Sequence, residues 1–259
     1  MGQDSLKKLG LAAAVAAGLF IGGLQPAKAD LSKEEVEKIV ESYILQHGDV
    51  VLKSVDDFQR KDMEERRLHA VEQNKEELFY NEKSPFIGNP DGDVTLIEFF
   101  DYNCHYCKDL FPSLKALSEG DKKLKIIFKD LPILGPTSET SARWALAAQR
   151  QGKYFEFHQK MMEHKGPIRD DDLESIAKDI GLDLGKVKHD VDGTDVLIQL
   201  ERNRSLAGQM NFSGTPSFVI DNVAFSGSVS KDELVQRIEE ARAHKKGKDD
   251  KKDDTKKPE

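Results

Sequence analysis

The two cysteines of the chain, Cys104 and Cys107, are separated by only two residues. They follow an apolar, β-branched and aromatic run over residues 94–100, which predicts a buried strand, and they open a predicted helix. Free backbone N–H groups and the macrodipole at a helix N-terminus stabilise an anion, so we expect a lowered pKa for the Cys104 thiol. The pattern predicts thiol–disulfide exchange in which Cys104 attacks and Cys107 resolves the mixed disulfide.

Two other chemistries fit the same pair of cysteines. Two thiolates could hold the soft ion Cu(I), and a structural disulfide would be inert. His105, when protonated, adds positive charge beside the Cys104 thiolate. Three other histidines lie in the central region and show no metal-ligand spacing: His158, His164 and His189. We therefore predict neither a metal site nor a cofactor.

A second element of interest is Gly214-Thr215-Pro216, directly before the apolar residues 217–220. Proline has no N–H to donate to a sheet, so it belongs at the start of a strand. Residues 217–220 and 223–225 flank the two-residue turn Asp221-Asn222 and predict a hairpin. Taken alone, the three residues are only a strand boundary.

The remaining elements suggest an α/β domain. Residues 124–129 predict a second strand, so strand, helix and strand form a βαβ unit with a central parallel sheet. Residues 137–210 predict several helices, and Ser230 with Glu233 caps a final helix. From residue 244 the chain is almost wholly Lys and Asp, and we expect a disordered tail over 244–259.

The first 29 residues have the pattern of a signal peptide. Lys7 and Lys8 precede an apolar run over residues 9–24, and Ala27-Lys28-Ala29 is a cleavage signal before Asp30. We therefore expect export to the periplasm with cleavage after Ala29, or association with the outer membrane; an uncleaved anchor is the alternative. Export places the cysteines in an oxidising compartment.

Residues 30–80 predict a helical stem. Ser32 and Glu35 form a capping box, and an apolar stripe follows at helical spacing: Val36, Ile39, Val40, Tyr43 and Ile44. A break at residues 47–49 starts a second helix that becomes almost wholly charged over residues 60–77. A solvated spacer is one reading. The stripe has no other evident partner, so we favour self-association as a dimer or trimer. The turn-rich residues 81–92 predict a linker.

Length and composition limit the alternatives. The chain has 259 residues, of which 33% are charged, and a net charge of −8. The mean hydropathy of −0.58 excludes a polytopic membrane protein, and the acidic balance argues against a general nucleic-acid binder. Two cysteines are too few for a disulfide-stapled miniprotein or a cysteine-rich zinc module.

The segment from Glu98 to Lys108, together with Gly214-Thr215-Pro216, resembles the DsbA-like thiol–disulfide oxidoreductases. The resemblance covers about residues 84–243 and implies a thioredoxin fold with an inserted helical domain. The stem around residues 41–44 and the linker around residues 88–92 are similar to the subgroup with an N-terminal oligomerising region, which includes ScsC and the Com-type proteins.

The resemblance also implies roles for single residues. Cys104 becomes the attacking thiol and Cys107 its partner; Pro216 becomes the cis-proline that faces the disulfide, and Thr215 pairs with substrate backbone. Glu98 falls where the family keeps a buried acid near the resolving thiol, which could exchange a proton with Cys107.

Lys129, on the next strand, is the expected partner of Glu98. The alternative for Lys129 is a solvated position at a strand edge.

The residues between the cysteines depart from the strongly oxidising members, which carry Pro-His there. His105 and Tyr106 occupy these positions, and Tyr before the second Cys with Thr before the proline is similar to the periplasmic isomerases. The sequence therefore predicts disulfide exchange in unfolded or misoxidised envelope proteins, by isomerisation, reduction or oxidation. A membrane redox partner would recycle the cysteine pair, and a copper-binding periplasmic chaperone is the alternative.

Overall fold

The computed structural model describes residues 31–254 and divides the chain into two compact units, Met1–Val55 and Asp56–Glu259. The predicted signal peptide and the last five residues of the charged tail lie outside the described residues. In the first unit, helix α1 (Lys33–Gln46) is followed by the start of α2 (Gly48–Gln73). The predicted capping box is present, because Glu35 N donates to the Ser32 hydroxyl and Ser32 N donates to the Glu35 carboxylate.

The apolar stripe of the first unit faces water. No residue of α1 is buried, although five of its side chains lie on one helix face. The exposed apolar side chains of this unit are Leu31, Val36, Ile39, Val40, Tyr43, Ile44, Leu45, Val50, Val51, Leu52 and Val55. An exposed apolar surface of this extent is characteristic of an interaction surface.

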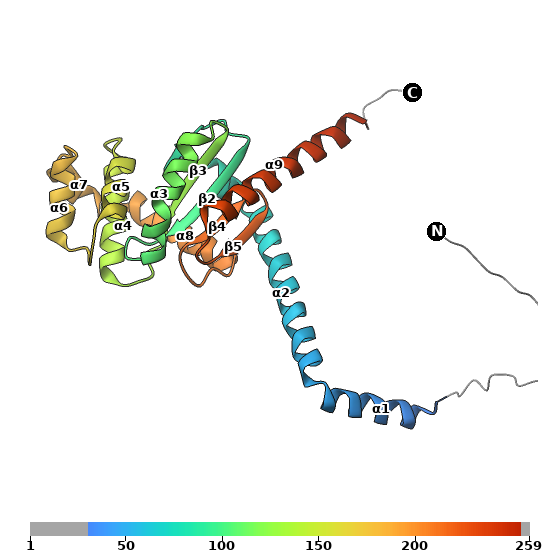
Figure 1. The fold of residues 1–259 in the computed structure, drawn as a ribbon. Helices are drawn as coiled ribbons and strands as arrows, with labels where there is room; N and C mark the ends of the chain where they lie inside the picture. Colours follow the sequence, from blue (N-terminus) through green and yellow to red (C-terminus); the bar gives the residue numbers. More distant parts are fainter. Residues whose placement is uncertain (1–30, 255–259) are drawn as a thin grey trace, which may run out of the picture. The chain divides into compact units, whose positions relative to one another are not determined.

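The second unit is built on a five-stranded mixed sheet with strand order β1-β3-β2-β4-β5 (Figure 1). Strands β2 and β3 are parallel, and the other neighbours are antiparallel. Helix α3 connects β2 to β3, as the sequence predicts. The strands are β1 (Phe86–Gly88), β2 (Val94–Phe100), β3 (Leu124–Asp130), β4 (Ser217–Ile220) and β5 (Val223–Ser226). The helices are η1 (Glu76–Tyr80), α3 (His105–Gly120), α4 (Pro136–Gln149), α5 (Tyr154–Glu163), α6 (Asp170–Asp179), α7 (Leu184–Asp190), α8 (Thr194–Gln209) and α9 (Lys231–Asp254).

Helices cover both faces of the sheet and give it a buried core on each side. Alternate residues of β2 point to opposite faces. Leu96 and Phe100 pack with α3 and α9, whereas Ile97 and Phe99 pack with the end of α2, η1 and α8. Both faces of β2 are buried, which explains its nearly continuous apolar sequence.

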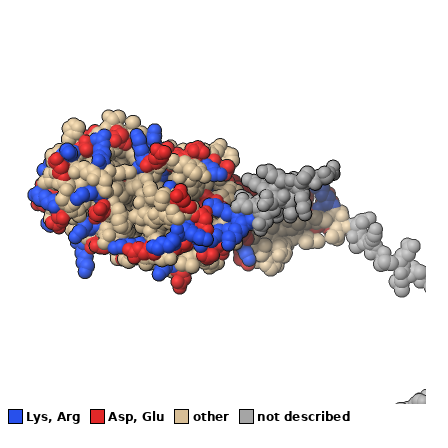
Figure 2. Space-filling model, turned by 90° about the horizontal axis from the view of Figure 1, so that it is seen from above, with Lys and Arg blue, Asp and Glu red and all other residues tan. Residues whose placement is uncertain are grey.

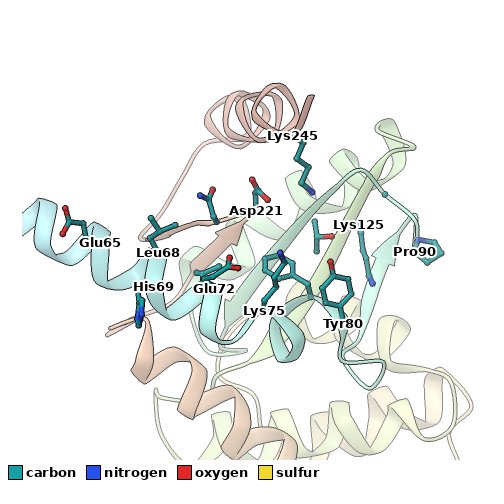
Figure 3. Close-up of a pocket in the computed structure, with 15 residues that line it drawn as sticks. Glu65, Leu68, His69, Glu72, Lys75, Tyr80, Pro90, Lys125, Asp221 and Lys245 are labelled. Atoms are coloured by element: carbon teal, nitrogen blue, oxygen red, sulfur yellow. The ribbon is translucent and has the colours of Figure 1, made fainter. Parts of the chain in front are cut away.

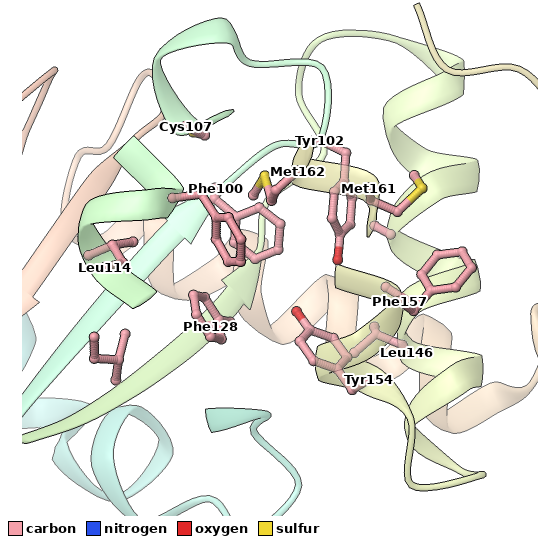
Figure 4. Close-up of a cluster of buried hydrophobic side chains, with 14 of the residues drawn as sticks. Phe100, Tyr102, Cys107, Leu114, Phe128, Leu146, Tyr154, Phe157, Met161 and Met162 are labelled. Atoms are coloured by element: carbon pink, nitrogen blue, oxygen red, sulfur yellow. The ribbon is translucent and has the colours of Figure 1, made fainter. Parts of the chain in front are cut away.

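Helices α4–α8 (136–209) are inserted between β3 and β4, and we call them the helical insertion. The core of the sheet continues into this insertion. Phe100 and Phe128 on the strands belong to the same buried cluster as Tyr154 and Met161 of α5 (Figure 4), and the rings of Phe128 and Tyr154 stack with 6.5 Å between their centroids. The thioredoxin fold with a helical insertion and an N-terminal helical region agrees with the predicted fold class.

The first difference from the sequence prediction is the end of the stem. The predicted boundary is residue 80, but the two units divide after Val55. Ala70 and Val71 of α2 and Leu78 of η1 are buried in the core on the second face of the sheet. The predicted linker contains β1, an edge strand paired with β3. The few buried residues lie within an almost wholly charged stretch, so they give no apolar periodicity that would identify a buried segment.

The second difference is the tail, where the prediction of disorder from residue 244 is wrong as far as residue 254. Helix α9 runs to Asp254. Side chains around residue 244, where the predicted tail begins, bond the domain: Lys245 Nζ donates to the Asp93 carbonyl at 2.7 Å, and Arg242 bonds both Asp93 and Asp121. A helix already nucleated by packing continues at little cost.

The surface of the second unit is highly charged but mixed in sign. Figure 2 shows Lys and Arg side chains interspersed with Asp and Glu side chains on the face that it presents. In residues 31–254, no helix combines the length and the apolar composition that crossing a membrane requires.

Candidate active site

Cys104 is the N-cap residue of α3, directly after the turn that ends β2. Its side chain is nearly buried, and both cysteines are free thiols. The Cys104 thiol donates to the carbonyl of Thr215 at 3.2 Å, so the loop before β4 lies against the thiol. The helix start predicted from the sequence therefore carries the Cys104 sulfur.

The environment of Cys104 favours the thiolate. Hydrogen bonding from the Cys107 thiol lowers the pKa of Cys104 to about 6, and burial opposes this shift. Hydrogen bonds from the Thr215 side chain and from the backbone N–H groups of Cys107 and Tyr106 add to the lowering of the pKa. Cys104 is therefore mostly ionised at neutral pH, as a nucleophile in disulfide exchange requires.

Cys107 lies one turn further along α3 and is fully buried (Figure 4). Burial raises the pKa of the Cys107 thiol well above its ordinary value, and the hydrogen bond with Cys104 and the charge of Glu98 act in the same direction. Glu98 on β2 is also fully buried, and burial raises the pKa of its carboxyl to about 8. Neither oxygen of Glu98 has a hydrogen-bond partner within the described residues. A carboxyl with these properties can exchange a proton with a buried thiol near neutral pH.

Lys129 is not the partner of Glu98, and the sequence-based expectation on this point is wrong. In the parallel register Glu98 pairs with Phe128, so Lys129 pairs with Phe99 and points to the other face of the sheet. The alternative of a solvated strand edge is also wrong, since Lys129 is fully buried. Its ammonium donates to the Glu77 carbonyl at 2.9 Å and to the Ser84 hydroxyl at 2.8 Å, and burial lowers its pKa to about 8. The hydrogen bond from Lys129 to the Glu77 carbonyl therefore links η1 to β3.

The loop before β4 carries the second predicted element. The Thr215–Pro216 peptide bond is cis, as the resemblance implies. The Ser217 hydroxyl donates to the Gly214 carbonyl at 2.7 Å and fixes the loop. Because β4 pairs with β2, this loop is brought beside the end of β2 and the start of α3. The structure therefore brings Thr215 and Pro216 together with Cys104, although more than a hundred residues separate them.

The two residues between the cysteines project away from the core. Tyr106 is 58% exposed, and the exposed imidazole of His105 contacts the Asp109 carboxylate, with 2.9 Å between Nε2 and Oδ2. Asp109 is not among the residues predicted from the sequence. Its position four residues after His105 on the same helix is a signal that could have identified the pair.

A cavity of about 680 Å³ lies at the opposite end of β2 from the cysteines, lined by the end of α2, η1 and the hairpin turn (Figure 3). Glu72, Lys75, Tyr80 and Lys125 line it, and it contains none of the predicted site residues. In the part of the chain that the structure describes, no cluster of three or more His, Cys, Asp or Glu side chains is arranged to hold a metal ion.

Solved structures of thiol–disulfide proteins share this fold. A thioredoxin-like oxidoreductase from Silicibacter pomeroyi is 36% identical, with a TM-score of 0.64 over 66% of this chain and 98% of that chain. A linker-deletion mutant of Proteus mirabilis ScsC is 25% identical, with a TM-score of 0.68 over 84% of this chain and 100% of that chain. The second alignment extends beyond the catalytic domain.

Two curated relatives each match 60% of this chain. Disulfide bond formation protein D of Bacillus subtilis is 28% identical over 60% of this chain and 75% of that protein. A Na(+)/H(+) antiporter NhaA of Salinispora arenicola is 26% identical over 60% of this chain, but the chain spans only 24% of that protein's length.

The family model described as a DSBA-like thioredoxin domain matches residues 95–239, which hold both cysteines, the helical insertion and the loop before β4. This match covers more than half of the 259 residues. The thiols, the buried carboxyl and the loop before β4 lie together near the C-terminal end of β2 in a thioredoxin sheet. Sequence and geometry therefore agree, and the chain belongs to the DsbA-like family of thiol–disulfide oxidoreductases.

Proposed function

We propose that the protein is an exported thiol:disulfide interchange protein that acts on envelope proteins through its Cys-His-Tyr-Cys site. The single observation that carries this proposal is the difference between the two thiols. Cys104 has a pKa of about 6 at the start of α3, and Cys107 is buried with a raised pKa. The cleavage signal before Asp30 supports export.

Reduction of a substrate disulfide would proceed in two exchanges. The Cys104 thiolate attacks one substrate sulfur, which forms a mixed disulfide and releases the other substrate sulfur as a thiolate. Glu98 then accepts the Cys107 proton, and the Cys107 thiolate attacks the Cys104 sulfur. This second exchange releases the reduced substrate and leaves a Cys104–Cys107 disulfide; oxidation of a substrate dithiol is the reverse.

Isomerisation needs only the first exchange, followed by attack of another substrate thiol on the mixed disulfide. The Tyr before Cys107 and the Thr before Pro216 support isomerisation or reduction at least as strongly as oxidation. The Thr215 side chain contributes to lowering the pKa of Cys104, and its backbone would pair with an extended substrate segment. Substrates are then unfolded or misoxidised envelope proteins, and a membrane redox partner recycles the pair.

Self-association through the first unit is part of this proposal. Its exposed apolar side chains form a stripe on α1 that has no partner within the chain's described residues. Pairing with further copies, as a dimer or trimer, would bury this stripe and bring several Cys104 thiols to one substrate.

The test is to trap the intermediate between the reduced protein and a substrate with scrambled disulfides. Cys107→Ser should accumulate a mixed disulfide through Cys104, because the second exchange cannot occur, whereas the matched variant Cys104→Ser should form none. The parent should refold scrambled ribonuclease. Tight binding of one Cu(I) per reduced parent chain, without mixed disulfides in Cys107→Ser, would favour the copper-chaperone alternative instead.

A further inference from the structure

The turn between β2 and α3 consists of Asp101, Tyr102 and Asn103, and we call it the pre-cysteine turn. Asp101 bonds the loop that precedes the helical insertion, and the side chains of Tyr102 and Asn103 bond the insertion itself. Turn residues usually face solvent, but Asp101 and Tyr102 are buried to 1% exposure. Such anchoring calls for an explanation in terms of the adjacent Cys104.

Asp101 joins the turn to the loop that leads from β3 to α4. One carboxylate oxygen accepts from the backbone N–H of Ile133 at 2.8 Å and of Leu134 at 2.9 Å. The other oxygen accepts from Asn103 N at 2.8 Å. A single buried carboxylate therefore satisfies three backbone donors and fixes the two segments to each other.

Asn103 joins the turn to the start of α4. Its amide nitrogen donates to the Thr137 and Ser138 hydroxyls, each at 2.9 Å. Ser138 is buried and Thr137 is exposed, so this bridge lies at the surface edge of the insertion. It is the contact with the insertion that lies closest to Cys104 along the chain.

Tyr102 joins the turn to α5. Its hydroxyl lies 3.0 Å from Nδ1 of His158, and burial lowers the pKa of His158 to about 3, so the ring stays neutral and can accept. The Tyr154 hydroxyl, which points towards that of Tyr102 in Figure 4, donates to Asp130 at 3.0 Å. The polar side chains of Tyr102 and His158 are surrounded by the aromatic core, and their hydrogen bond links the turn to α5.

Cys104 follows this turn directly, and its backbone N–H donates to the Asp101 carbonyl at 3.0 Å. The thiol sits between the N–H groups at the start of α3 and the Thr215 carbonyl, so its reactivity depends on a placement within fractions of an ångström. We propose that the pre-cysteine turn positions Cys104 by fastening it to the helical insertion, so that the packing of the insertion controls the reactivity of the cysteine pair. This inference rests on the proposed exchange function.

The Asn103 bridge gives the sharpest test, because it can be cut from either end. Asn103→Ala removes the donor, and the double variant Thr137→Val with Ser138→Ala removes the acceptors without changing the turn. Thr140→Val is the matched control: Thr140 also lies on α4, and its hydroxyl bonds only the Pro136 carbonyl within its own helix. We would measure the Cys104 pKa by ultraviolet absorbance of the thiolate, the equilibrium constant with glutathione and the urea midpoint.

Loss of the bridge should weaken the hydrogen bonds to the thiolate and so raise the Cys104 pKa. The reduced form then loses stabilisation, and the equilibrium with glutathione moves about three- to tenfold towards the Cys104–Cys107 disulfide. Both bridge variants should shift alike, their combination should add nothing further, and Thr140→Val should match the parent.

Parental pKa and equilibrium constants in both bridge variants would overturn the inference, as would an equal shift in Thr140→Val. If Asn103→Ala does not fold, the double variant alone decides. A parent that exchanges no disulfide with glutathione contradicts the proposed function itself, whereas equal exchange in parent and bridge variants contradicts only the positioning role.

Discussion

At the scale of single residues, the two thiols differ in environment, and this difference orders their reactions. Cys104 is the nearly buried N-cap residue of α3, while Cys107 is fully buried beside the carboxyl of Glu98, which has no hydrogen-bond partner among the described residues. Hydrogen bonds lower the pKa of the first thiol to about 6, whereas the second thiol needs a proton acceptor. The pH dependence of each step should therefore report on a different residue.

The first prediction concerns the ionisation of Cys104. In the reduced protein, the rate of alkylation by iodoacetamide should be half-maximal near the Cys104 pKa of about 6 and level off at higher pH. The largest cause of the low pKa is the hydrogen bond with Cys107, so Cys107→Ala should move the midpoint to higher pH, and Cys107→Ser should move it less. A parental midpoint near the ordinary thiol value of about 8.5 would contradict the assignment of the nucleophile.

The second prediction concerns Glu98 in the oxidised protein, where the thiols do not titrate. With both thiols free, burial raises the pKa of this carboxyl to about 8, and the charge of Cys104 adds to the shift. Burial persists in the oxidised protein, so the folded pKa there also lies above the unfolded value. The carboxyl therefore favours folding fully below its unfolded pKa, and this contribution is lost as pH rises through the folded pKa. Glu98→Gln should match the parent at pH 4 and exceed its stability at pH 8 by a few kcal/mol, since each pKa unit is about 1.4 kcal/mol.

Urea unfolding at both pH values measures this effect, and Glu82→Gln, at an exposed position, is the matched control. Equal stability of parent and Glu98→Gln at pH 8 would show that burial does not raise the pKa of the Glu98 carboxyl.

At the scale of elements, the sequence was sufficient for the strands and helices that carry chemistry. Apolar runs, the two-residue turn and helical periodicity predicted β2, β3, the β4–β5 hairpin and the start of α3 at Cys104. Strand β1 was missed because its three residues lie among Gly, Pro and Asn at a sheet edge. The face of Lys129 was also beyond prediction, since it depends on the register of β2 against β3, which one strand alone does not specify.

The buried residues at the end of α2 and in η1 correct the expected end of the stem and give the third prediction. Removing residues 30–55 should leave a folded, redox-active second unit. Removing residues 30–80 should destabilise it by several kcal/mol, because Ala70, Val71 and Leu78 leave the core and the buried Lys129 loses the Glu77 carbonyl. Circular dichroism and urea unfolding compare the two truncations. Equal stability would show that η1 contributes nothing to the domain.

At the scale of the whole molecule, two units of different character share one chain. The second unit has its own core, whereas α1 in the first unit has no buried residue. The match to ScsC covers 84% of this chain, which is more than the catalytic domain alone. We therefore expect the first unit to set the number of active sites that a substrate meets.

The fourth prediction tests this expectation. Light scattering should show more than one chain per particle for the mature protein and a single chain after removal of residues 30–55. The truncated form should still oxidise dithiols but refold much less scrambled ribonuclease, because this refolding benefits from several Cys104 thiols close to one substrate. Ile39→Asp with Ile44→Asp, two changes on the exposed stripe, should reproduce the truncation; Glu37→Gln is the control. A monomeric parent would falsify the self-association proposal.

The exposure of His105 and Tyr106 has a consequence for how such a protein can change. Neither side chain supports the core, because the His105 imidazole contacts the exposed Asp109 and the Tyr106 phenol is largely exposed to water. Substitutions at these two positions therefore alter the electrostatic surroundings of the reactive sulfur with little effect on folding. Selection, or a laboratory library confined to this dipeptide, can therefore vary the surroundings of Cys104 in single steps while the fold stays the same.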